Sequence, residues 1–199
     1  MSEVLAFNKW SSEGISIEDP GLITYISLKP QYVPKTGARY AGRRFHKSKV
    51  FIVERLINKL MVPGHKGKKH RKSSGHCTGK ANKVYQAVED AFKIVEKKLN
   101  KNPVEVFVKG VENAAPREEV VTIEYGGARY PKAVECAPQR RIDVVLKLMA
   151  TGTYDQCFNK KKSLAQALSD EIIWAYNMDA KSTAISKKNE AERQADASR

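Results

Sequence analysis

Almost all of the excess positive charge lies in one quarter of the chain. Residues 35–83 hold fifteen Lys or Arg and a single acid, Glu54, whereas basic and acidic residues balance over the remainder. This segment therefore accounts for the whole formal net charge of +14. Charge of this size constrains partners more than fold. Its clustering predicts a globular body that carries a polycationic segment for nucleic acid or an anionic membrane.

Length and composition indicate one globular domain. The chain has 199 residues, 41% of them hydrophobic, which is enough for a buried core. No apolar run approaches the roughly 20 residues that span a bilayer, and MSEVLAFNKW lacks the pattern of a secretory signal peptide. Three cysteines, an odd number, suit a reducing compartment. We therefore expect a cytoplasmic protein that makes no membrane contact.

The first 47 residues differ from the rest of the chain. They contain many Gly and Pro and little periodicity, apart from a possible short strand at LITYISL, residues 22–28. We expect residues 1–47 to form a basic, extended N-terminal arm and residues 48–199 to form a single helical domain. The charge also predicts that residues 1–47 and 64–82 are largely mobile in the free protein.

Hydrophobic residues at helical spacing predict about six helices after residue 47. In the first, Ser48 is a plausible N-cap and Pro63-Gly64 a stop. The third begins at Asn102-Pro103, a favoured cap and first turn. Ser163 is expected to cap the fifth. The predicted ranges are 48–62, 81–99, 103–115, 138–152, 163–176 and 184–198.

A β-hairpin is predicted at about residues 120–136. Val121, Ile123 and Tyr125 alternate with polar residues, and Gly126-Gly127 supplies the positive-φ pair of a tight turn. Pro131 cannot donate a hydrogen bond to a neighbouring strand, so it belongs on an edge. The fold class is therefore mainly α, a bundle of about six helices with one projecting β-hairpin and a basic extended arm.

The densest basic stretch, HKGKKHRKSSGHCTGKANK at residues 65–83, allows several kinds of chemistry. A metal site would use His65, His70, His76 and Cys77, but their spacing matches no zinc motif and nearby cations repel a dication. GHCTGKA departs from a Walker phosphate loop, and adjacent His76 and Cys77 rarely meet as a catalytic pair. We expect no metal and no cofactor. A metal-dependent nucleic-acid enzyme built on these four residues stays the alternative.

Binding of a polyanion explains the stretch better. Lys and Arg release counterions as they neutralise phosphates, and interspersed glycines let the backbone come close. The basic blocks 39–49 and 65–72 flank one predicted helix, so they can meet on one face. A projecting ribbon suits irregular folded RNA, and no helix-turn-helix or zinc-finger spacing indicates a duplex-DNA reader.

The candidate RNA-binding residues are basic side chains of this segment, of the hairpin and of two later helix boundaries. They are Arg39, Arg43, Arg44, Lys47, Lys49, Lys66, Lys68, Lys69, His70, Arg71, Lys72, Lys80, Arg129, Lys132, Arg140, Arg141, Lys160, Lys161 and Lys162. Arg binds phosphate bidentately, and a helix N-terminus adds its dipole near Arg140 and Arg141. For these two arginines, surface salt bridges are an equally good interpretation.

Four motifs in the same order make the chain resemble the family of the seventh universal protein of the small ribosomal subunit. They are KSKVFIVERLINKLM, PREEVVTIEYGGARYPKAVECAPQRR, KSLAQALSDEII and AISKKNEAERQADASR. The similarity runs from about residue 35 to the end. The N-terminal FNKW, DPGLITYI and TGARYAGRRF resemble the archaeal and eukaryotic branch, and we favour the archaeal.

The resemblance implies a non-catalytic ribosomal protein, a helical bundle with an extended β-hairpin. It implies binding to the 3′ major domain of small-subunit ribosomal RNA, a part in organising the head, and a hairpin near the exit-site tRNA and the mRNA exit. The eleventh and ninth universal proteins of the subunit are the implied neighbours. Gly126, Gly127, Arg129 and Tyr130 fall on the hairpin tip; Arg140 and Arg141 begin the fourth helix; Arg43, Arg44, Lys47 and Lys49 match the basic lead-in to the first.

One segment departs from the family pattern. The turn after the first helix is short in many members, whereas here it is expanded into residues 65–83. The contacts of this segment are not implied by the resemblance. From its charge alone, we interpret it as a longer anchor on ribosomal RNA.

Overall fold

The computed structural model of the chain describes residues 4–35, 37–38, 40–63, 65–66, 69–70 and 80–199. Most of the segment 64–82, for which mobility was expected, lies outside these ranges. Several residues named above also lie outside the described residues, namely Arg39, Lys68, Arg71, Lys72, His76 and Cys77.

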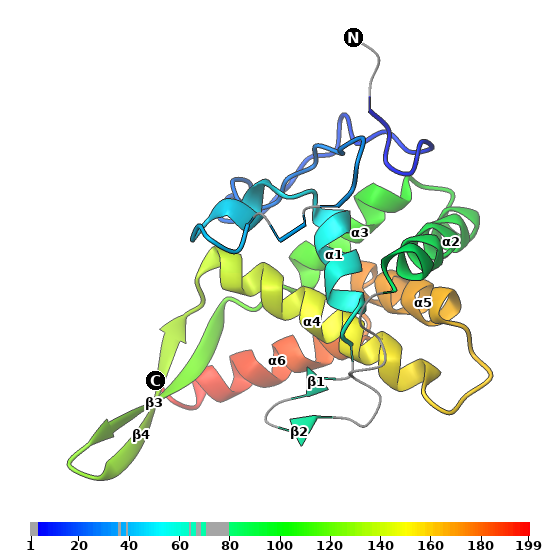
Figure 1. The fold of residues 1–199 in the computed structure, drawn as a ribbon. Coiled ribbons are helices and arrows are strands. Elements are labelled where there is room, and N and C mark those ends of the chain that lie inside the picture. The colour runs from blue at the N-terminus through cyan, green and yellow to red at the C-terminus, as the bar shows by residue number, and fades with distance from the viewer. Residues whose placement is uncertain (1–3, 36, 39, 64, 67–68, 71–79) are drawn as a thin grey trace.

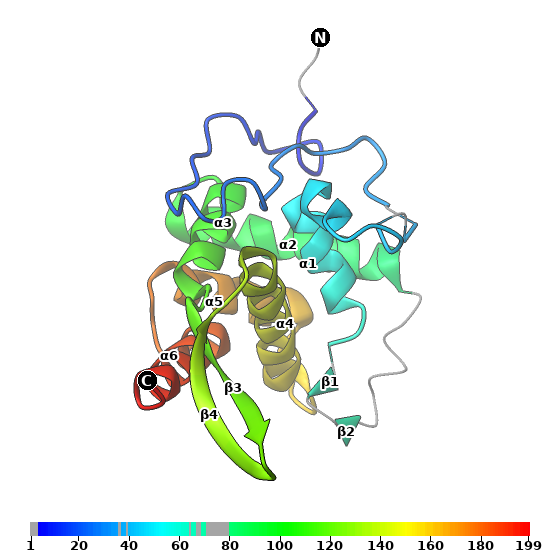
Figure 2. The ribbon, with the colours of Figure 1, turned by 90° about the vertical axis from the view of Figure 1, so that its left-hand side faces the viewer.

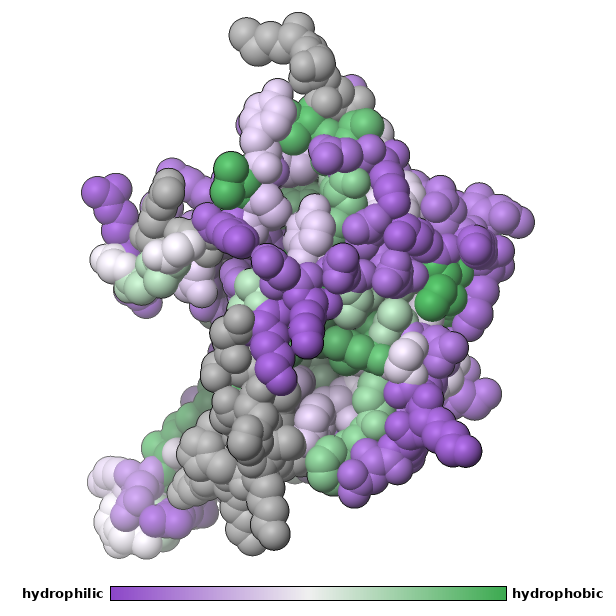
Figure 3. All heavy atoms as spheres, turned by 45° about the vertical axis from the view of Figure 1, so that its right-hand side comes forward, coloured by the Kyte–Doolittle hydropathy of each residue, from purple (hydrophilic) through white to green (hydrophobic). Residues whose placement is uncertain are grey.

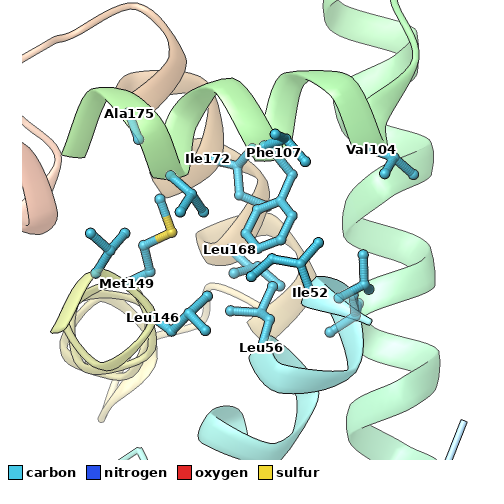
Figure 4. Packing of buried hydrophobic residues seen from close by; sticks show 14 of the residues in the cluster. Ile52, Leu56, Val104, Phe107, Leu146, Met149, Leu168, Ile172 and Ala175 are labelled. Atoms are coloured by element: carbon cyan, nitrogen blue, oxygen red, sulfur yellow. The ribbon is translucent and has the colours of Figure 1, made fainter. Parts of the chain in front are cut away.

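Within the described residues the fold is mainly α, as predicted. A short 3-10 helix η1 (His46–Lys49) precedes the α-helices α1 (Ile52–Leu60), α2 (Ala81–Leu99), α3 (Pro103–Ala114), α4 (Pro138–Cys157), α5 (Leu164–Tyr176) and α6 (Thr183–Asp196). The helix α5 packs against α2, α3 and α4. Its Leu168 and Ile172 are fully buried and meet side chains of α1, α3 and α4 (Figure 4).

Local capping signals predicted several helix starts correctly. Asn102 accepts a hydrogen bond from the Val104 N–H at 3.0 Å, directly before Pro103. Ser163 and Gln166 form a reciprocal capping box at the start of α5. Because these signals depend on residues within one turn, no tertiary contact is needed to predict them.

The first predicted helix is divided in the structure. Ser48 lies within η1 with its side chain buried, so its prediction as the N-cap of the helix is wrong. Val50 and Phe51 are extended, and α1 begins only at Ile52. The break has a tertiary cause, because Phe51 forms a parallel bridge with Ser27 and the Ile52 N–H donates to the Ser27 carbonyl at 3.0 Å.

The N-terminal arm runs across the top of the body but is fastened to it (Figures 1 and 2). Trp10 and Leu22 are buried in the same hydrophobic cluster as the helices, and the Trp10 ring lies 5.8 Å from that of Phe92. The predicted strand at 22–28 is wrong, because the Tyr25 and Ile26 N–H groups both donate to the Leu22 carbonyl in a helix-like turn. These contacts count against a mobile arm over residues 4–28.

The predicted hairpin is confirmed as β3 (Glu118–Tyr125) and β4 (Ala128–Glu135), joined by Gly126 and Gly127 at φ +57° and +81°. Both glycines are left-handed, as a tight hairpin turn with the right twist requires. The ribbon projects from the body on the side away from the arm (Figures 1 and 2). Its base is held near α6, where Arg199 donates to Glu118 at 2.7 Å.

A second, very short ribbon lies within the basic stretch. The strand β1 (His65–Lys66) pairs antiparallel with β2 (Lys69–His70), and His65 stands opposite His70. The periodicity of the sequence did not predict this pairing, since the stretch contains no apolar alternation.

Candidate nucleic-acid interface

A basic trough lies between α1 and the first half of α4, two helices that pack on each other. Its wide end, beside the start of α4, has a volume of about 620 Å³. Two smaller hollows of about 130 and 390 Å³ are also lined by Lys59, and the second lies farther along α4, beside Ala150 and Thr151. We define the trough by the residues that give it its character: Arg44, Phe45, Lys47, Lys59, Arg140 and Lys147.

Helix periodicity explains why two of these lysines point outward. Leu56 and Leu60 are buried on the core face of α1, and Lys59 lies between them on the exposed face. Leu146 is likewise buried on α4, and the next residue, Lys147, is exposed. Neither lysine was among the predicted binding residues. Their helical positions indicated exposure, but only the packing of α1 on α4 brings the two together.

One carboxylate, that of Asp143, sits among the cations of the trough. It accepts hydrogen bonds from Lys47 Nζ and, at 3.1 Å, from Arg55 Nη2. Burial by itself raises the pKa of Asp143, but the Lys47 hydrogen bond and the Arg55 charge outweigh this and lower that pKa. The carboxylate is therefore ionised at neutral pH, and its ion pair with Lys47 neutralises the charge of that lysine.

Three trough cations are not neutralised in this way. In the part of the chain that the structure describes, Arg44, Lys59 and Lys147 form no ion pair. Like charges gathered on one surface repel one another, so the arrangement does not stabilise the fold by itself. It instead produces a field that attracts an anion with several charges.

The adjacent arginines at the start of α4 have different roles. Arg140 is 58% exposed at its side chain and forms a bidentate pair with Glu119, with distances of 2.6 and 2.7 Å. Arg141 is buried; its guanidinium donates to Asp19 at 2.7 Å and to the Pro116 carbonyl at 3.0 Å. Arg141 therefore ties the N-terminal arm to α4, and we remove it from the predicted RNA-binding set.

The remaining predicted residues are spread over other parts of the surface. Lys160 and Lys161 are exposed beyond the end of α4, a helix of 20 residues and hence about 30 Å in length. They lie past the opposite end of this helix from Arg140. Lys162 is half-buried, hydrogen-bonded to Gln156 at 2.8 Å and ion-paired with Asp170 at 2.8 Å. Exposed side chains elsewhere are Arg43, Lys49, Lys80, Arg129, Tyr130 and Lys132. For Lys66, Lys69 and His70 the structure gives only the strand backbone.

The hairpin differs in charge from the trough. Its two strands carry four glutamates and only two cations, Arg129 and Lys132. The guanidinium of Arg129 lies 3.5 Å from Glu124. Tyr125 and Tyr130 are 81% and 58% exposed near the tip. The ribbon therefore presents aromatic surface and a net negative charge.

Comparison with known proteins decides the family. The family model described as ribosomal protein S7p/S5e matches residues 23–199. The chain belongs to this family. It is 50% identical over 193 residues to the small ribosomal subunit protein uS7 of Nanoarchaeum equitans, covering 97% of this chain and 98% of that protein.

Two further archaeal relatives of the S7p/S5e family have the same printed name. The protein of Archaeoglobus fulgidus is 46% identical over 197 residues, covering 99% of this chain and 96% of the relative. That of Methanosphaera stadtmanae is 47% identical over 187 residues, covering 94% of each. These similarities confirm the resemblance found in the sequence and its archaeal branch.

The S7p/S5e family also decides between the alternatives raised by the basic stretch. The family is structural and not enzymatic, which excludes the metal-dependent enzyme. Among the described residues, no group of three or more His, Cys, Asp or Glu is placed to hold a metal ion. Two of the four residues of that alternative, His76 and Cys77, lie outside the description. Within the described ranges, no helix is both long and apolar enough to cross a membrane.

Proposed function

We propose that this chain is a structural constituent of the small ribosomal subunit in the cytoplasm and that it binds the 3′ major domain of the subunit's RNA. The single observation that carries the proposal is the trough, where Arg44, Lys59 and Lys147 converge from three segments without acidic partners among the described residues. Such a surface suits the phosphates of a folded RNA. Membership of a ribosomal family supports it independently.

The trough acts as the central contact in this proposal, and the other basic segments extend it. The stretch 65–83 leaves the end of α1, on which Lys59 lies, so it is connected to the trough. Lys160 and Lys161 lie beyond the far end of α4. A protein that holds RNA at both ends of one helix fixes the relative positions of those RNA segments, which is how we propose it helps to organise the head of the subunit.

The hairpin is proposed to reach toward the exit-site tRNA and the mRNA exit through its tip. What supports this is its projection from the body and the exposed Arg129, Tyr130 and Lys132 near the turn. The glutamates along its strands disfavour phosphate contact over its whole length. We propose the ninth and eleventh universal proteins of the subunit as neighbours on the strength of the family resemblance.

The proposal is tested by the salt dependence of binding to isolated 3′ major domain RNA. Wild-type affinity should fall by orders of magnitude between about 50 and 200 mM salt. Replacing both Lys59 and Lys147 by Ala should flatten the slope of log K against log salt by about 1.4–1.8, which corresponds to two lost phosphate contacts. The two lysines are exposed, so the variant should fold normally.

A matched double variant controls for total charge. Lys97 and Lys181 are also exposed lysines, on α2 and on the turn before α6, and neither lines the trough. Their replacement by Ala should leave the slope nearly unchanged. Equal slopes for the two double variants would show that the trough does not contact RNA phosphates. Equal affinity for duplex DNA of the same length would support a general DNA binder instead.

A further inference from the structure

We infer that the wide end of the trough holds an unpaired nucleotide of the bound RNA, with its base stacked on Phe45 and its phosphates on the surrounding cations. The inference rests on the proposed function and deepens it. It specifies that the RNA at this place is not a continuous duplex. It also assigns to Phe45, which no charge pattern singled out, the role of a base-stacking residue.

Phe45 is placed unusually for a phenylalanine. It precedes η1, is 54% exposed, and lines the wide end of the trough among five cations. At this exposure the ring gives up much of the stabilisation that full burial would contribute. The fold gains little from the residue in this position, so an external partner that covers the ring is the more economical explanation.

The neighbouring guanidinium makes the ring suitable for stacking. Arg44 Cζ lies 5.5 Å from the centroid of the Phe45 ring. Arg planes and aromatic rings are the two surfaces on which proteins commonly stack unpaired RNA bases. Since Arg44 also forms no ion pair among the described residues, it is able to contact the phosphate of the same nucleotide.

The size and polar lining of the wide end also suit a nucleotide. Its volume of about 620 Å³ lies within the roughly 300–1,000 Å³ typical of small-ligand sites. Gln139 lines it from the first turn of α4, and the Nε2 atom of this side chain is buried without a hydrogen-bond partner in the described structure. An unsatisfied buried donor is unfavourable. A turn of the Gln139 side chain into the hollow would let a base oxygen or ring nitrogen accept from it.

A regular duplex would use only part of this site. A-form RNA presents phosphates, 2′-hydroxyls and a shallow minor groove, which cations suffice to contact. It offers no base face to a ring on the protein surface. An aromatic ring, a buried amide donor and cations around one hollow therefore indicate an unpaired nucleotide more than a helix.

The experiment measures binding of the full chain to two probes, isolated 3′ major domain RNA and a fully paired RNA duplex of similar length. Stacking of one base is worth about 1–3 kcal/mol, so Phe45→Ala should weaken binding to the domain RNA about 5- to 160-fold. Phe45→Leu, which keeps apolar bulk, should lose about as much, and Phe45→Trp should retain most of the affinity. The salt slope should stay as in wild type, because no phosphate contact is removed.

Two controls complete the design. Met178→Ala truncates another exposed apolar side chain, 64% exposed and far along the chain after α5, and should leave affinity unchanged. On the paired duplex, Phe45→Ala should bind like wild type. Thermal melting of each variant checks that the fold is intact.

The outcomes separate this inference from the proposed function. If Phe45→Ala binds the domain RNA like wild type while the Lys59/Lys147 variant flattens the salt slope, the trough binds RNA but holds no stacked base. Equal losses on domain RNA and duplex would also overturn the inference. If the Phe45 variants instead weaken only the association with another small-subunit protein, the wide end is a protein-docking surface. If the Lys59/Lys147 variant also leaves the affinity and the salt slope unchanged, the proposed function itself is contradicted.

Discussion

Replacing Asp143 by Asn should lower the stability of the protein and at the same time strengthen its binding to RNA. The carboxylate lies 3.1 Å from Arg55, whose side chain is only 6% exposed, and it also holds Lys47. Its loss leaves a nearly buried guanidinium without its counter-charge, and it frees an ammonium at the trough. Stability should fall while RNA affinity rises, and few non-specific effects of a substitution would produce both changes.

The structure sets the size of both effects. Removing one partner of a fully buried pair costs about 3–5 kcal/mol, and an exposed pair is worth about 0–1 kcal/mol. With Asp143 23% exposed, we expect an intermediate loss of about 1–3 kcal/mol, which for a chain of this length lowers Tm by roughly 2–12 °C. Release of Lys47 should steepen the salt slope by about 0.7–0.9 if it gains one phosphate.

The assays are thermal melting and the salt titration with 3′ major domain RNA. Asp90→Asn is the matched control, because Asp90 is 58% exposed on α2, pairs with Lys93, and its loss changes net charge equally. The control should melt like wild type and bind RNA with an unchanged slope. An unchanged Tm for Asp143→Asn, or weaker RNA binding, would refute the reasoning about this ion pair.

Three further predictions concern acid stability, the packing of α4 on α6, and the basic stretch. The pKa of Asp19 is lowered despite burial by Arg141, and the pKa of Asp143 is lowered despite burial by Lys47 and Arg55. The stability that these carboxylates contribute is therefore present above the unfolded pKa of about 4 and is lost as pH falls through the folded values. Tm should consequently drop more steeply with acid in wild type than in Asp143→Asn. Gly152→Ala would place a Cβ 2.5 Å from Thr183 Oγ1 and 2.7 Å from its Cβ, so overpacking of α4 against α6 should cost about 1–3 kcal/mol, whereas Gly42→Ala meets nothing within 4 Å and should melt like wild type. The last prediction concerns four cations of the basic stretch, Lys68, Lys69, Arg71 and Lys72. Replacing them together by Ala should flatten the salt slope of RNA binding by up to about four phosphate contacts. An unchanged slope would show that the stretch does not contact phosphates.

Features that depend on a few neighbouring residues were predictable from sequence. Asn102-Pro103, the Ser163 capping box and the Gly126-Gly127 turn each fix their own backbone, and the structure has all three. The break between η1 and α1 was not predictable in this way, because its cause is a bridge to Ser27 in the arm. Intrinsic propensity yields to such tertiary contacts.

The candidate binding surface was predictable only in part, and for a similar reason. Charge density pointed to the segment that supplies Arg44 and Lys47, both of which line the trough, but it cannot distinguish Arg140 from Arg141, which are chemically identical and adjacent. The distinction lies in the helix face, since Arg141 stands one turn before the buried Val145. Lys59 and Lys147 each look like ordinary exposed helix residues until α1 packs against α4.

The surface in Figure 3 illustrates why composition alone does not locate the interface. Hydrophilic side chains cover most of that face, with hydrophobic ones in scattered patches (Figure 3). Charged groups of this kind are common on soluble proteins and mostly have no specific partner. What distinguishes the trough is concave shape together with cations that lack acidic neighbours among the described residues.

The most direct test of the account is chemical protection of individual lysines in the assembled RNA complex. The full chain, free and bound to 3′ major domain RNA, is treated briefly with an acetylating reagent, and the modified lysines are read by mass spectrometry. We predict that Lys59 and Lys147 react in the free protein and are protected in the complex, while Lys97 and Lys181 react equally in both. Full reactivity of Lys59 and Lys147 in the complex would contradict the claim that this trough binds the RNA.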